Sequence, residues 1–159
     1  MTVFRSLLFG LSLLLVIPAL TRGDSLPQSI GSLRLEQLQV GEEARQEIDR
    51  LHGKHLNFRK GCVGTYVGGD RKAKVWVSEY DSEVEAAKAN ERMAQEIQAM
   101  EGNGFWHFRE ISISEMSVNF VMGQGQAHYF FQKGKRVIWL TVDPSEASET
   151  VTDLIDQVP

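Results

Sequence analysis

The chain has 159 residues, of which 42% are hydrophobic and 24% charged, a composition typical of one globular domain. Its formal net charge is −4 at pH 7, which excludes attraction to nucleic acid or anionic lipid through overall charge. A single cysteine excludes an internal disulfide.

The first residues have the three-part pattern of a secretory signal. Arg5 precedes a nearly unbroken apolar run over residues 6–20, and small or polar residues follow. The run is shorter than the about 20 residues that a bilayer-spanning helix needs. We therefore expect residues 1–23 to be a signal peptide cleaved after Gly23, with cleavage after Ala19 as an alternative. A retained N-terminal anchor is the other interpretation.

A cleaved signal predicts a periplasmic or extracellular protein with no stable membrane anchor. Cleavage removes Arg5 and Arg22 and no acidic residue, so the net charge falls from −4 to −6. In an oxidising compartment the lone Cys62 is either buried and inert, or pairs with another chain or a ligand.

Residues 24–32 contain proline, glycine and several serines, and we expect a flexible tether there. Residues 33–159 are expected to form a single α+β domain. Its first helix is predicted over 41–52, because apolar residues share one helical face and Gly53 follows.

Two strands joined by a tight turn are predicted next. Residues 57–67 are rich in β-forming side chains towards their end, and residues 72–80 alternate between apolar and polar side chains. The Gly-Gly-Asp sequence at 68–70 is typical of the hairpin turn between them.

A long helix and a second sheet-forming region complete the chain. Ser82 and Glu85 form a capping-box pattern, which predicts a helix from Ser82 to Glu101. A final helix is predicted to begin at Asp143, with Asp143 as its N-cap. Between the two helices lie four strand-like segments, at residues 105–113, 116–122, 127–132 and 136–142.

The sequence contains an internal similarity at an offset of 63 residues. The identical pairs are Tyr66/Tyr129, Lys72/Lys135, Trp76/Trp139, Ser82/Ser145 and Glu83/Glu146. We interpret this as two duplicated ββα-containing halves, at about 41–101 and 105–158. The predicted fold is an antiparallel sheet with helices packed on one face, and a ferredoxin-like arrangement is also compatible with the element order.

Three residues are candidate metal ligands. His52, His55 and Cys62 are close in sequence, and imidazole and thiolate bind zinc or copper. A helix C-terminus accounts for His52 without a metal, because cationic side chains are favoured there. A second pair, His107 and His128, lies on predicted strands and could meet across the sheet, or could be two ordinary strand histidines.

The motifs of the sequence favour a non-enzymatic chain without a cofactor, and an enzyme is the less favoured alternative. The Gly123-x-Gly125 turn leads into a strand, whereas a phosphate-binding loop leads into a helix. The sequence also lacks a Gly-x-Ser-x-Gly nucleophile elbow. Basic residues near both predicted hairpin turns either form two matching patches or protect strand edges, and they are Arg71, Lys72, Lys74, Lys133, Lys135 and Arg136.

Aromatic residues are concentrated in the second half of the chain. Neighbours such as Phe130 and Phe131 must point to opposite faces of a strand. Such a pattern forms either a thick two-sided core or a binding face.

The sequence therefore predicts an exported, non-enzymatic domain that binds a protein partner, or itself, through an aromatic-rich sheet face. The expected contact residues are Trp106, Tyr129, Phe131, Trp139, His107 and His128. The alternative is a periplasmic small-ligand or metal-binding protein that uses the histidines and Cys62.

Overall fold

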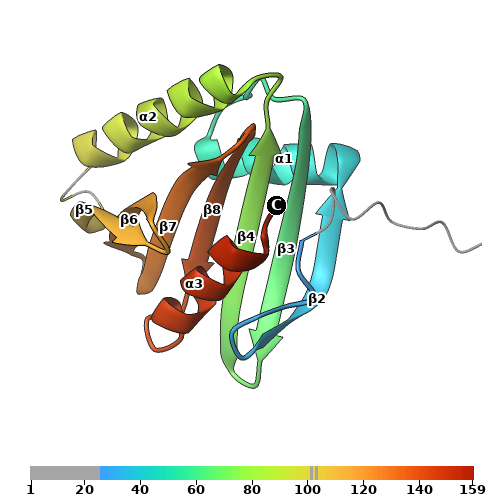
Figure 1. The fold of residues 1–159 in the computed structure, drawn as a ribbon, viewed down its shortest axis with the longest axis vertical. Coiled ribbons are helices and arrows are strands. Elements are labelled where there is room, and N and C mark those ends of the chain that lie inside the picture. The colour runs from blue at the N-terminus through green and yellow to red at the C-terminus, as the bar shows by residue number, and fades with distance from the viewer. Residues whose placement is uncertain (1–25, 101, 103) are drawn as a thin grey trace, which may run out of the picture.

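The computed structural model describes residues 26–100, 102 and 104–159. A curled antiparallel sheet of eight strands forms its centre, in the order β1-β2-β3-β4-β8-β7-β6-β5 (Figure 1). The helices are α1 (Gly41–His52), α2 (Glu83–Ala99) and α3 (Ala147–Gln157). The strands are β1 (Ser29–Ile30), β2 (Leu33–Val40), β3 (Lys60–Gly68), β4 (Arg71–Glu79), β5 (Phe105–Ile113), β6 (Met116–Gly123), β7 (Gln126–Lys133) and β8 (Arg136–Val142).

This arrangement confirms a mixed α+β fold with an antiparallel sheet. The expected signal peptide, residues 1–23, lies outside the described residues. The tether expected over 24–32 lies partly outside them, and its described part is structured. Ile30 is fully buried and β1 pairs with β2, because the apolar side chains of this segment complete the core beside α3.

The prediction that all helices pack on one face is wrong. In Figure 1, α3 lies in front of the sheet and α1 behind it. Ile48 of α1 and Met93 of α2 belong to one buried cluster, whereas Leu154 of α3 belongs to the other. The reason lies in the central strands: six of the seven residues of β8 are buried, so both of its faces need a cover.

The two predicted repeats meet at the centre of the sheet. Trp76 of β4 and Trp139 of β8 lie directly opposite each other, so their side chains share one face. The hairpins β3–β4 and β7–β8 therefore flank this pair symmetrically in the strand order. The helices that follow them, α2 and α3, cover opposite faces, and the duplication stays a hypothesis.

Replacing Phe130 or Phe131 by alanine tests whether both faces of the sheet carry core. Each ring is 0% exposed and the two belong to different clusters, so each loss should lower the unfolding free energy by about 3–5 kcal/mol. Urea unfolding followed by circular dichroism measures it. Trp106→Ala, at a side chain 49% exposed, is the control and should cost less than about 1 kcal/mol. A cost near that of the control for either phenylalanine contradicts a two-sided core.

Candidate functional site

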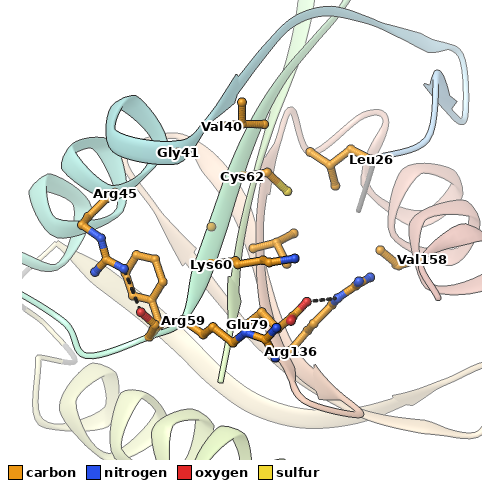
Figure 2. Close-up of a pocket in the computed structure, with 13 residues that line it drawn as sticks. Leu26, Val40, Gly41, Arg45, Arg59, Lys60, Cys62, Glu79, Arg136 and Val158 are labelled. Carbon is orange, nitrogen blue, oxygen red and sulfur yellow. Dashed lines mark hydrogen bonds and ion pairs between the residues drawn. The ribbon is translucent and has the colours of Figure 1, made fainter. Parts of the chain in front are cut away.

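A cavity of about 390 Å³ lies on the face of the sheet that α3 covers (Figure 2). We call it the α3-side cavity. It is lined where β3 and β8 begin, where β4 ends, at the start of α1 and just after α3. The side chains labelled in Figure 2 come from all of these elements, and the lining is more apolar than polar.

Strand pairing places the lining residues in two rows. Lys60, Glu79 and Arg136 are register partners across β3, β4 and β8, so they form one polar row. In the next row on the same face, Cys62 and Val77 line the cavity and Ile138 lies beside them, and all three belong to or pack against the α3-side core. The cavity thus has an apolar wall bordered by charge.

Arginine and lysine dominate that charge. Arg45, Arg59, Lys60 and Arg136 line the cavity, against one carboxylate, Glu79. The Arg136 Nε lies 3.4 Å from the Glu79 Oε2, and both side chains are 18% exposed. The cavity is therefore a cationic site on a chain with a formal charge of −4.

The approach of α1 to the sheet positions Arg45. Its guanidinium donates to the carbonyl oxygens of Phe58, at 2.7 Å, and Leu56, at 3.3 Å, and lies 4.1 Å from the centre of the Phe58 ring. Gly61 permits this packing, because a Cβ there would lie 2.7 Å from Ile48 and 2.9 Å from Phe58. Arg45 is thereby fixed at the cavity edge.

A second cavity, also of about 390 Å³, lies on the opposite face. We call it the α2-side cavity. It is lined by α2, by the end of α1 and the loop that follows, and by β4 and β8. Both cavities share the same strands: Ser78 and Val137 face one, and Glu79 and Arg136 face the other.

The structure does not bring together the three predicted metal ligands. His52 and His55 line the α2-side cavity, whereas Cys62 lines the α3-side cavity across the sheet. The Nδ1 of His52 lies 2.9 Å from the carbonyl oxygen of Ile48, and the Nδ1 of His55 lies 2.7 Å from the Asp49 carboxylate. No cluster of three or more His, Cys, Asp or Glu residues suited to a metal occurs in the described part of the chain.

The histidines predicted on strands are also apart. His107 is exposed on β5, at a bulge and with φ +61°, whereas His128 is buried on β7 with β6 in between. The His128 Nε2 lies 2.9 Å from the carbonyl oxygen of Gly123 and donates to it. Burial lowers the pKa of His128, and the hydrogen bond to Gly123 opposes this shift only in part.

The predicted aromatic contact residues are mostly core. Tyr129 and Phe131 are buried on the α3 side of the sheet. Trp139 is buried on the other side, where it stacks on Phe130 at 5.0 Å between ring centroids. Only Trp106 is largely exposed among the four. The geometry thus supports the alternative, a thick two-sided core.

Three of the six basic residues near the hairpin turns hold helices against the sheet. Arg71 pairs with Glu146 just before α3, and Lys74 pairs with Glu47 of α1. The Lys133 Nζ donates to the carbonyl oxygens of Ile155 and Val158 at the end of α3. These three contacts are structural, whereas Lys72 and Lys135 are exposed and Arg136 lines the α3-side cavity.

Sequence reasoning missed most of the cationic site. Arg45, Arg59, Lys60 and Glu79 have no motif in common, and they converge through strand pairing. The adjacent pair Arg59-Lys60, inside the strand predicted over 57–67 and within three residues of Cys62, was the one local signal.

Comparisons of the chain with protein-family models, with curated proteins and with solved structures find no match. Within residues 26–100, 102 and 104–159, no helix has the length and apolar character needed to cross a membrane.

Burial of His128 predicts a pH-dependent stability. The unfolded chain protonates this side chain near pH 6.5, about its unperturbed pKa, and the folded chain only at lower pH. The unfolded state then binds more protons, so the unfolding free energy should fall as the pH drops from about 6.5 towards 5. Glu47, whose pKa is lowered by its hydrogen bond to Lys74, contributes only at more acidic pH.

His128→Phe should flatten this part of the profile, measured by urea unfolding at each pH. His107→Phe, at an exposed position, is the control and should leave it unchanged. Equal slopes in the parent protein and the His128 variant would show that His128 is not the group responsible.

Proposed function

We propose that this protein is an exported, non-enzymatic domain that binds a small amphipathic anion in the α3-side cavity. The observation that carries the proposal is an apolar cavity lined by four cationic side chains and one carboxylate. Export is part of the proposal and rests on the signal pattern of residues 1–23. Concave, mostly apolar sites with a few placed polar groups are typical of small-ligand binding.

The two rows of lining residues suggest how such a ligand would lie. An alkyl or aryl body fits against Cys62, Val77 and Val158, and each methylene it buries contributes about 0.8 kcal/mol. An anionic head group fits beside Lys60 and Arg136, where charge-assisted hydrogen bonds are stronger than neutral ones.

Binding is favoured over catalysis by the composition of the site. A thiol nucleophile needs a base within hydrogen-bond reach, and none of the described residues that line the α3-side cavity together with Cys62 is a histidine. Binding of a protein partner through the aromatic-rich face is less favoured, because Tyr129, Phe131 and Trp139 are buried.

Cys62 provides a direct test, because it is the only cysteine of the chain and lines the cavity. Octanoate is the probe and octanol its uncharged control. Octanoate should slow the alkylation of Cys62 by iodoacetamide in a saturable way, followed by mass spectrometry. Octanol should need at least a tenfold higher concentration for equal protection. Equal protection by both probes argues against an anion site, and no protection by either argues against the cavity as a ligand site.

Substitutions of acidic and basic residues in the polar row should change the octanoate affinity in opposite directions. Glu79→Gln removes the one carboxylate and should raise the octanoate affinity by about threefold to tenfold, whereas Lys60→Gln should lower it by a similar factor. The measurement is the octanoate concentration that halves the alkylation rate. Lys88→Gln, on the exposed side of α2, is the matched control and should change nothing. A lower affinity in the Glu79 variant would contradict the proposed position of the head group.

A further inference from the structure

We infer that the α2-side cavity is a second binding site, which takes a small planar carboxylate through the indole N–H groups of Trp76 and Trp139. Both tryptophans line this cavity, and they lie opposite each other on β4 and β8. This site does not depend on the one proposed above.

The first argument is the state of the two indole groups. Trp76 is 8% exposed and Trp139 6%, and neither Nε1 atom has a hydrogen-bond partner among the described residues. An indole nitrogen can only donate, and a buried donor without an acceptor costs about 1–3 kcal/mol. Two such donors, on tryptophans that both line one cavity, suit a ligand that brings acceptor atoms.

The second argument is the excess of donors around the cavity. Tyr80 lines it, and burial raises the pKa of its hydroxyl, although the nearby Arg92 opposes this shift, so the hydroxyl stays a donor at neutral pH. Arg92 and Lys54 add positive charge, and Lys54 pairs at 2.5 Å with Glu96, the one carboxylate in the lining. A carboxylate ligand complements this set.

The third argument concerns shape and composition. On the sheet side of the site lie the rings of Trp76 and Trp139, and Trp139 is itself stacked on Phe130, outside the lining, with an interplanar angle of 8°. The side of α2 contributes Ala89 and Met93, which are small or adaptable. A planar apolar body fits between such surfaces better than a branched one.

The three tryptophans of the chain supply the test. With 15N-labelled tryptophan, each gives one indole resonance, and Trp→Phe variants assign them. Benzoate is the probe and benzyl alcohol the uncharged control. We expect benzoate to shift the resonances of Trp76 and Trp139 in a saturable way and to leave that of the exposed Trp106 unchanged.

Three variants test how much each hydrogen-bond donor of the α2-side cavity contributes to benzoate binding. Trp76→Phe and Trp139→Phe keep a ring and remove one donor, so each should weaken benzoate binding by about fivefold to twentyfold. Arg92→Gln, at an exposed position, should weaken it while both indole resonances remain visible, which covers the case that a tryptophan variant does not fold. Trp106→Phe is the matched control.

Two results would overturn the inference. One is benzoate leaving the Trp76 and Trp139 resonances unchanged up to its solubility limit. The other is benzoate protecting Cys62 from alkylation without moving those resonances, which assigns its binding to the α3-side cavity. Failure of octanoate to protect Cys62 would refute the first site and leave this one standing.

Discussion

The structure depends on one constraint: its central strands are apolar on both faces. Alternate side chains of a strand point in opposite directions, so Phe130 and Trp139 need cover on one side while Phe131 and Leu140 need it on the other. Helices on both faces satisfy the requirement, and residues 26–32 complete the cover beside α3. Because the helices close only part of each face, an opening remains on either side of β4 and β8, and these openings are the two cavities.

Contacts of charged side chains fix the positions of α1 and α3 on the sheet. Lys74 reaches Glu47 on α1, and Lys133 reaches the carbonyl oxygens at the end of α3. The backbone N–H of Gly31 donates to the Asp153 carboxylate at 2.7 Å, which ties the first described segment to the same helix. The mouth of the α3-side cavity thus lies between elements that are each held to the sheet, which suits a preformed site.

Local patterns in the sequence predicted individual elements well. The predicted N-cap of α2, Ser82, is confirmed by a hydrogen bond of 3.2 Å from the Glu85 N–H to the Ser82 hydroxyl, and Gly53, with φ +65°, caps the end of α1. The predicted start of α3 was wrong: Asp143 accepts from the Ser145 N–H in a turn, and the helix begins at Ala147. Aspartate favours both a cap and such a turn, so the sequence did not separate them.

Local sequence patterns could not predict on which face of the sheet each helix packs. They also could not predict which residues converge on the cavities. Glu79 and Arg136 meet because β4 pairs with β8, and this pairing joins residues 57 positions apart. The alternating pattern of each strand indicates two faces but does not say which helix covers which. The aromatic residues were misread as a surface for the same reason, since a buried two-sided sheet and a sheet with a binding face have similar side-chain patterns.

The bulge in β5 has a consequence for how copies of this chain meet. In the described residues the sheet ends at β1, which is only two residues long, and at β5, whose pairing shifts between Trp106 and Arg109. A free, regular strand would offer its backbone to a strand from another molecule and start a growing fibre. Both edge strands oppose such polymerisation. β1 is short, and β5 is bent at the bulge, where the backbone of His107 has a left-handed conformation.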